Sequence, residues 1–239
     1  MSDFIEPLAR LSLEAQGLTD FAALWPEAPA GGELSQLLFG EGSTYYLLRR
    51  SGPQPRRLWP LRGAALLGRE RRQTQRALAR QVPVLPVLLH AERQVGSVRC
   101  AVLLLQVPEG LRPLSDWLAE WASLEPRRQH ALLRACGEAL RSLHAARLRH
   151  AALSPATLLL RAEGARFEAF LCHLQHSRAL WRGRRDRLRD LQALQQHSAP
   201  CWGAREWQHL LGCYLDEFER LDRWLQALGW TLADTGARG

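Results

Sequence analysis

The sequence predicts an α+β fold in two lobes, a small strand-rich lobe followed by a mainly helical one. Strand-like segments and one arginine-rich helical stretch occupy the first 107 residues. Helical periodicity dominates after that point and is interrupted by one short hairpin. This order is typical of α+β domains. The break at Pro108-Glu109-Gly110 divides the chain into a first lobe of residues 1–107 and a second of residues 108–239.

Turn residues and apolar runs define the elements of the first lobe. Pro26 and Pro29 close a leading helix, and Gly40 and Gly42 supply the turn of a hairpin. Val98–Val107 is a continuous apolar run, as expected for a buried strand. The expected elements are a helix at 18–25, strands at 33–39 and 43–50, a polar loop at 51–57, a helix at 63–81, a short strand after the prolines of 82–89, and the strand at 98–107.

The second lobe is predicted to be helical around one small sheet. Ser115 and Asp116 mark a helix start, and Glu163-Gly164 marks a turn between two strands. The tryptophans near the C-terminus are expected to pack in the core. The expected elements are helices at 114–122 and 126–146, strands at 157–161 and 167–172, and helices at 184–197 and 203–228.

All 32 basic Lys and Arg residues are arginine, and the chain of 239 residues contains no lysine and no asparagine. GC-rich coding explains most of this bias, but the chemical consequence is the same. A net charge of +8 favours nucleic acid, anionic lipid headgroups or phosphorylated glycans as partners. No apolar stretch predicts a membrane span, and the first residues do not resemble a signal peptide. The five cysteines lack metal-ligand spacing and are expected to be reduced and buried.

A helix ending in Leu-His, a short loop and a strand of leucines lie between residues 143 and 160. The kinase catalytic loop has the form His-Arg-Asp-Leu-x-x-x-Asn before a strand. His150, Leu153 and Pro155 fit that pattern. The catalytic aspartate position falls on Ala152, and the metal-binding asparagine position falls on Thr157.

The same register extends outward from the loop. The strand at 170–175 corresponds to the one that carries a Mg²⁺-binding aspartate, and that position falls on His173. Glu70 fits the helix glutamate that pairs with the strand lysine. The lysine position falls on Leu48, next to Arg49.

Together these segments resemble the lipopolysaccharide core (Kdo/heptose) kinase family, over roughly residues 40–200. The resemblance implies a minimal two-lobed protein-kinase-like fold. It implies ATP and Mg²⁺ as cofactors of an active member, which would phosphorylate a core sugar. It also gives Glu70 and Arg49 as the residues that could contact a nucleotide.

The departures from the family pattern predict a pseudokinase without catalytic residues, cofactor or metal. Arg49 does not match the geometry of a lysine, and His173 is a poor Mg²⁺ ligand because Mg²⁺ prefers oxygen. An atypical active kinase that uses Glu70, Asp186 and Asp190 stays open as an alternative, and so does an arginine-rich nucleic-acid-binding module.

Two further groups of residues have competing interpretations. His150 is expected to bond backbone groups within the loop, and Cys172, His173 and His176 lack zinc geometry. The arginines between 178 and 189 are either a solvated face paired with Asp186 and Asp190 or an anion-contacting patch. The candidates for anion contact are Arg182, Arg184, Arg185 and Arg187.

The predicted function is therefore a scaffold or regulator in lipopolysaccharide assembly. The expected partner is another envelope-assembly protein or kinase, with an anionic glycan or lipid headgroup as a further ligand and nucleic acid disfavoured. The expected location is cytoplasmic, peripheral at the inner membrane of a Gram-negative bacterium.

Overall fold

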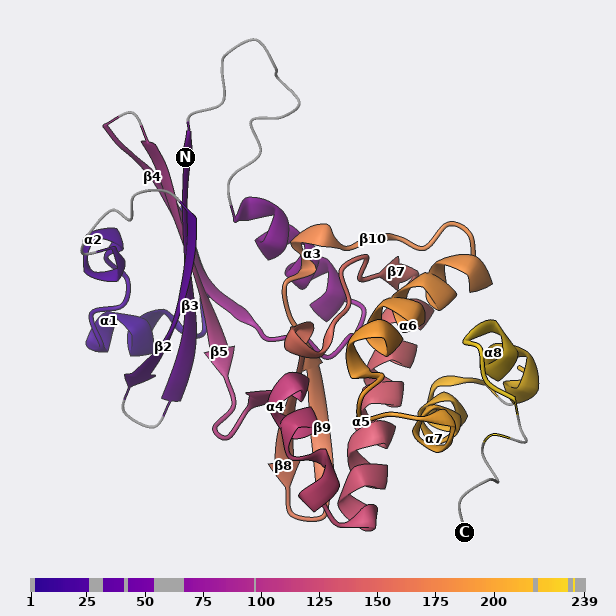
Figure 1. Cartoon of the computed structure of the whole chain (residues 1–239). Coiled ribbons are helices and arrows are strands. Elements are labelled where there is room, and N and C mark those ends of the chain that lie inside the picture. The colour runs from indigo at the N-terminus through magenta and orange to yellow at the C-terminus, as the bar shows by residue number, and fades with distance from the viewer. Residues whose placement is uncertain are drawn as a thin grey trace. The chain divides into compact units, whose positions relative to one another are not determined.

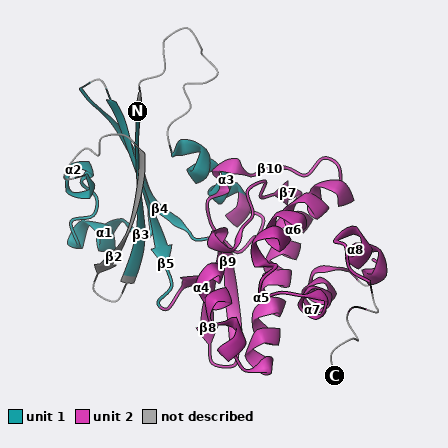
Figure 2. Ribbon diagram, in the orientation of Figure 1, with its two compact units in different colours: residues 1–76, 85–109 teal, residues 77–84, 110–239 magenta. Residues whose placement is uncertain are grey.

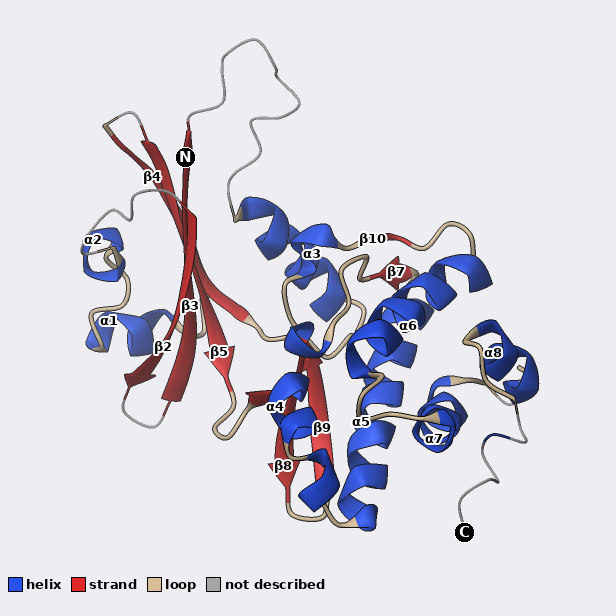
Figure 3. Ribbon diagram, in the orientation of Figure 1, coloured by secondary structure: helices blue, strands red, loops and turns tan. Residues whose placement is uncertain are grey.

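A computed structural model describes residues 3–25, 32–40, 43–53, 67–96, 98–216, 219–231 and 234. Helices and strands are both abundant, which confirms the predicted α+β class (Figure 3). The chain separates into two compact units (Figure 2). The first comprises Met1–Arg76 and Leu85–Glu109, and the second comprises Ala77–Val84 and Gly110–Gly239. The short segment Ala77–Val84, which the sequence-based division put in the first lobe, therefore groups with the second unit.

The first unit is built on a five-stranded antiparallel sheet in the order β1-β4-β5-β3-β2. Helices α1 (Arg10–Ala15) and α2 (Phe21–Leu24) lie together on one face of this sheet (Figure 1). Leu13 and Leu24 from these helices pack with Leu47, Val102 and Leu104 of the sheet. The strands are β1 (Phe4–Ile5), β2 (Gly32–Gly40), β3 (Ser43–Pro53), β4 (Val87–Val95) and β5 (Val98–Val107).

The predicted hairpin and the strand at 98–107 are confirmed, while three boundaries in this unit were wrong. Strand β3 continues through Pro53 into the expected polar loop, and β4 is a long strand rather than a short one. The expected helix at 18–25 is only the single turn of α2, which Asp20 caps by accepting the Ala22 N–H at 3.1 Å.

Helix α3 (Gly68–Leu78) is shorter than the stretch expected at 63–81, of which 63–66 lies outside the described residues. It ends because Gln81 adopts a left-handed φ of 58°, and the Val82 N–H then bonds the Ala77 carbonyl at 3.0 Å. Ala77 and Thr74 of this helix are buried, whereas Leu78 is 37% exposed.

The second unit packs its helices around α5 and a three-stranded sheet of order β6-β8-β9. Both predicted hairpin strands and the long helix are confirmed. The expectation of one helix at 203–228 was wrong, because Leu215 has an extended backbone (φ −79°, ψ 151°) and divides this stretch into two helices. The elements are β6 (Arg112–Pro113), α4 (Leu114–Ala119), α5 (Pro126–Ala145), β7 (Leu148–Arg149), β8 (Leu158–Glu163), β9 (Arg166–Leu171), β10 (Arg178–Ala179), α6 (Arg184–Ser198), α7 (Ala204–Tyr214) and α8 (Leu221–Ala227), with 3₁₀ turns at Trp121–Ser123, Pro155–Thr157 and Leu174–His176.

Helices α5 and α7 approach each other closely at Gly137. A Cβ on that residue would lie 2.7 Å from the Leu210 carbonyl oxygen, so a side chain cannot fit there without a shift of backbone. Trp202, Trp207 and Trp224 are almost completely buried beside this contact, which confirms their predicted core packing. In the part of the chain that the structure describes, no helix is long and apolar enough to cross a membrane.

Candidate functional site: the loop after β7

The loop that follows β7 is held by a buried side chain of α6. Asp190 is 2% exposed, and its carboxylate accepts the His150 N–H at 2.6 Å and the Ala151 N–H at 3.0 Å. Ala151 has a left-handed φ of 63°, a conformation that a non-glycine residue adopts only when its surroundings enforce it. The two hydrogen bonds supply that constraint, so Asp190 fixes the loop backbone.

Asp190 also belongs to a buried polar cluster within the second unit. The His144 Nε2 atom lies 3.3 Å from its Oδ2 atom, and His144 Nδ1 lies 2.7 Å from the Tyr214 hydroxyl. Burial raises the pKa of Tyr214, so the hydroxyl keeps its proton. The cluster joins α5, α6 and α7 to the loop, because each contributes one of these side chains.

His150 is fully buried and ties the loop to the end of β9. Its Nε2 atom lies 2.8 Å from the Cys172 carbonyl oxygen. Only a protonated nitrogen can donate to a carbonyl, so Nε2 carries the hydrogen. Burial lowers the pKa of His150, which keeps the ring neutral. The expectation that His150 bonds a backbone group is therefore confirmed, although the acceptor lies after β9 and not within the loop.

The positions where a kinase carries its catalytic aspartate and asparagine offer little chemistry. Ala152 is exposed and has only a methyl group. Thr157 is nearly buried, and its hydroxyl accepts the Ser154 N–H at 3.0 Å and donates to the Ser154 carbonyl at 3.0 Å. The Thr157 side chain thus closes the turn within the loop instead of facing a ligand.

His173 occupies the metal-aspartate position after β9 and keeps an unusual backbone. Its φ and ψ are 56° and 45°, in the left-handed region where Asn, Asp and His are enriched. An imidazole there presents nitrogen, whereas Mg²⁺ takes oxygen ligands. Among the described residues no group of three or more His, Cys, Asp or Glu side chains could hold a metal ion.

The remaining kinase-register residues lie in the first unit. Leu48 is 0% exposed in β3, paired with Leu103 of β5. Arg49 points to the other side of the sheet, since neighbouring residues of a strand alternate. Its Nε atom donates to the Leu24 carbonyl at 2.6 Å, and burial lowers its pKa, so Arg49 holds the end of α2. Glu70 is 3% exposed in the first turn of α3.

Asp186 holds a second loop, between β10 and α6. It is 5% exposed, and its Oδ2 atom accepts the Arg182 N–H at 2.9 Å and the Trp181 N–H at 3.1 Å. Its Oδ1 atom lies 3.2 Å from Nη1 of Arg149 and 3.6 Å from Nη1 of Arg189. The two backbone groups, first of all that of Arg182, and the cation Arg149 lower the pKa of Asp186.

The interpretation of Asp186 and Asp190 as carboxylates available to an active site was wrong. Both are buried, and each is committed to two backbone N–H groups. One sequence signal for the role of Asp190 is the Arg-Asp-Leu triplet at 189–191. Their structural function followed only from the placement of α6 beside both loops.

The four candidate anion-contact arginines differ in their surroundings. Arg187 pairs with Glu219 at 2.5 Å and lies over the Trp224 ring, with 4.7 Å to its centroid. Arg184 also lies over Trp224 and donates to the Arg223 carbonyl at 2.8 Å. Arg182 and Arg185 have exposed side chains. Arg184 is exposed as well. Three of the four arginines are therefore accessible to solvent, while Arg184 and Arg187 are engaged with α8 and its flanks.

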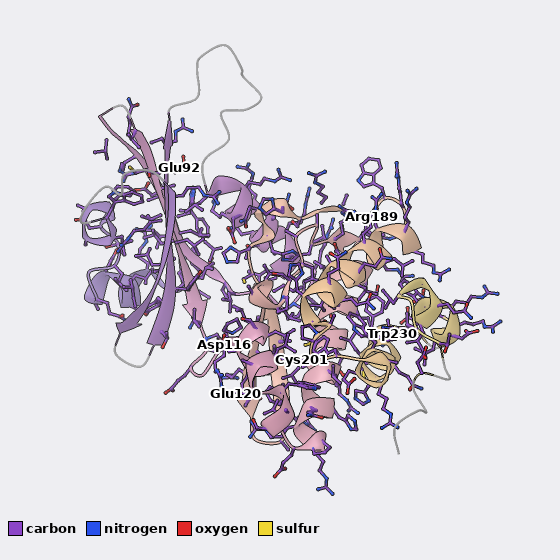
Figure 4. The ribbon with its side chains drawn as sticks, viewed as in Figure 1. Glu92, Asp116, Glu120, Arg189, Cys201 and Trp230 are labelled. Carbon is purple, nitrogen blue, oxygen red and sulfur yellow. The ribbon has the colours of Figure 1, made fainter. Side chains whose placement is uncertain are left out.

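Two hollows in the second unit lie away from the loop and were not expected from the sequence. One, of about 510 Å³, lies between α5 and β9 and is lined by Arg127, His130, Arg134 and Arg166. The other, of about 640 Å³, lies beside the start of α7 and includes Cys201 and Trp230, which are labelled in Figure 4.

The fold and the loop geometry together define a kinase-like protein. A solved structure described as WaaP in complex with acyl carrier protein matches this fold with a TM-score of 0.66 and 17% identity, over 99% of this chain and 98% of that one. The model of the lipopolysaccharide kinase (Kdo/WaaP) family matches residues 40–214. The chain belongs to that family. No curated protein matches it in sequence.

Proposed function

We propose that this protein is a pseudokinase of the lipopolysaccharide kinase family that acts as a scaffold or regulator in lipopolysaccharide assembly. The observation that carries the proposal is the hydrogen-bonded loop in which Ala152 and Thr157 stand where a kinase needs an aspartate and an asparagine. The chain has no lysine or asparagine that could take over from elsewhere.

Phosphoryl transfer depends on charge placed around the transferred group and its Mg²⁺ ions. Leu48, Ala152 and His173 supply neither the cation nor the carboxylates at the expected places. Asp186 and Asp190, the carboxylates that could have compensated, are used by backbone N–H groups. Each of these points supports loss of phosphoryl transfer and weakens the alternative of an atypical active kinase.

The first test is a thermal-shift titration of the full chain with ATP and ADP, each with and without Mg²⁺. A ligand that binds only the folded state at 100 times its Kd stabilises by about 2.7 kcal/mol. We expect no shift that depends on Mg²⁺, and no phosphate transfer to lipopolysaccharide core oligosaccharide. Transfer by the pure protein would overturn the proposal.

We further infer a protein partner and a location on the cytoplasmic side of the inner membrane. The related WaaP structure contains acyl carrier protein, so acyl carrier protein is the first partner to test here. The exposed arginines Arg182 and Arg185 support contact with an anionic surface. Co-elution of the two purified proteins in size-exclusion chromatography tests the partner directly, with a kinase of the same pathway as the next candidate.

A further inference from the structure

Trp181 is the exception among the tryptophans of this chain. Its side chain is 85% exposed, whereas most of the other tryptophans in the described ranges are 8% exposed or less and Trp230 is half-buried. Leaving a large aromatic side chain in water forgoes the stabilisation that burial would provide. Trp and Arg are both enriched at contact surfaces, so an exposed Trp among arginines is a candidate for one.

The exposed indole is presented by a hydrogen-bonded backbone. On one side, Leu180 is 8% exposed and its N–H donates to the Arg147 carbonyl at 2.8 Å. On the other, the N–H groups of Trp181 and Arg182 both donate to Asp186. The preceding strand β10 pairs with β7. The backbone that carries the exposed ring is therefore fixed on both sides.

The surroundings of Trp181 are strongly basic. Residues 178–185 contain four arginines and no acidic residue. Arg184 is engaged with Trp224. Arg178, Arg182 and Arg185 are exposed, and no ion pair or side-chain hydrogen bond joins them to another residue of the described chain. Arg189, which is labelled in Figure 4, lies about one turn after Arg185 on α6.

We propose that Trp181 together with Arg178, Arg182 and Arg185, here called the Trp181 platform, docks on the surface of an anionic phospholipid bilayer. Tryptophan favours the boundary between headgroups and acyl chains because its ring is apolar and its N–H is polar. Arginine forms charge-assisted hydrogen bonds with phosphate. A sugar site would place a wall opposite the ring, and the 85% exposure of Trp181 leaves no such wall.

One aromatic side chain and three cations give weak and reversible attachment, because stable anchoring needs more apolar area or a second signal. The platform would therefore orient the protein at the membrane rather than fix it there. This inference rests on the proposed membrane location but not on the proposed loss of phosphoryl transfer.

The test is co-sedimentation of the full chain with vesicles of phosphatidylcholine alone or mixed with phosphatidylglycerol, without nucleotide. We expect Trp181→Ala to lower partitioning about tenfold. The triple variant Arg178→Gln, Arg182→Gln, Arg185→Gln should lower it roughly a hundredfold on the mixed vesicles, at about fivefold for each arginine. Thermal unfolding of each variant verifies that it folds.

The matched control removes the same charge from the hollow between α5 and β9, as Arg127→Gln, Arg134→Gln, Arg166→Gln. We expect it to retain binding within a few-fold. Quenching of tryptophan fluorescence by brominated lipid should be present in the wild type and reduced in Trp181→Ala. Two outcomes would overturn the platform while leaving the membrane location in place. One is an equal loss of vesicle binding in both triple variants, and the other is unchanged binding in Trp181→Ala. Absence of vesicle binding would overturn both, and neither result touches the question of catalysis.

Discussion

Asp186 and Asp190 lie one turn apart on α6, and each accepts the backbone N–H groups of two consecutive residues. Asp190 holds His150 and Ala151 in the kinase-like loop, and Asp186 holds Trp181 and Arg182 in the loop before α6. The surroundings differ. Asp190 lies among His144 and the loop backbone, whereas Asp186 also pairs with arginines.

The comparison shows that the chain fixes both loops but displays different chemistry on them. Where Asp190 holds the backbone, the exposed side chain is the methyl group of Ala152. Where Asp186 holds the backbone, an indole and a guanidinium reach solvent. An ordered loop with nothing reactive on it is consistent with a structural role, and an ordered loop with a large cationic and aromatic surface is consistent with binding.

The largest expected effect comes from Asp190→Ala. It leaves the His150 and Ala151 N–H groups buried without an acceptor and removes the constraint on a left-handed alanine, which we expect to cost about 3–5 kcal/mol of the free energy of unfolding. Urea denaturation of the purified chain measures it. Asp190→Asn keeps one oxygen acceptor and should lose less. A loss below about 1 kcal/mol in Asp190→Ala would contradict the assigned role.

Asp186→Ala should cost less, about 2 kcal/mol, because the residues it holds are at the surface, where water can replace the lost acceptor. The change should be local. Amide hydrogen exchange is expected to speed up at Trp181 and Arg182 while His150 and Ala151 keep their protection. A global loss equal to that of Asp190→Ala would remove the distinction between the two aspartates.

Much of this fold could be predicted from residue patterns. The apolar run of β5, the hairpin β8–β9 and the helix α5 came from periodicity and turn residues, and their bounds agree with the structure within a residue or two. Apart from the break within the stretch expected to be helical at 203–228, the failures were at ends that depend on more distant residues. The continuation of β3 through Pro53 and the end of α3 at a left-handed Gln81 leave no mark in local composition.

The candidate site divided in the same way. Ala152 and Thr157 were assigned to the catalytic positions from the fixed spacing of the loop pattern, and this assignment stays a prediction. The roles of Asp186 and Asp190 could not be predicted, because their partners are backbone groups 4 to 40 residues away in the chain. A backbone N–H is present at every residue except proline, so sequence gives no sign of which one a carboxylate will bind.

Acidification should lower the stability of the folded chain through His150, the buried histidine of the loop held by Asp190. The pKa of His150 is lowered from 6.5 by burial, so the folded state disfavours its charged form. The contribution of the neutral His150 ring to the free energy of unfolding is fully present above pH 6.5. It is lost as the pH falls below that value, because the unfolded chain then binds a proton that the folded chain does not. The free energy of unfolding should fall by up to about 1.4 kcal/mol per pH unit.

His150→Gln should make the free energy of unfolding depend less on pH below pH 6.5. Urea denaturation at a series of pH values measures this dependence. His209 is the matched control, because burial and then the neighbouring His130 lower its pKa as well but it lies outside the loop. His209→Gln should remove only the part of the pH dependence of stability that His209 itself contributes. An unchanged slope in His150→Gln would mean that the buried ring does not govern acid sensitivity.

The smallest expected effect, and the sharpest test of the vacated loop, is Thr157→Val. It removes the hydroxyl that both accepts from and donates to Ser154, and should cost about 1 kcal/mol of stability. Thr157→Ser keeps the hydroxyl and should retain most of it. Neither change should alter a thermal shift with ATP and Mg²⁺, because the side chain is committed within the turn. The contrary result would be a Mg²⁺-dependent thermal shift that the wild type and Thr157→Ser show and that Thr157→Val loses. That result would mean that the Thr157 hydroxyl contacts a bound metal ion. The loop held by Asp190 would then present a ligand-binding group, as the loop held by Asp186 does.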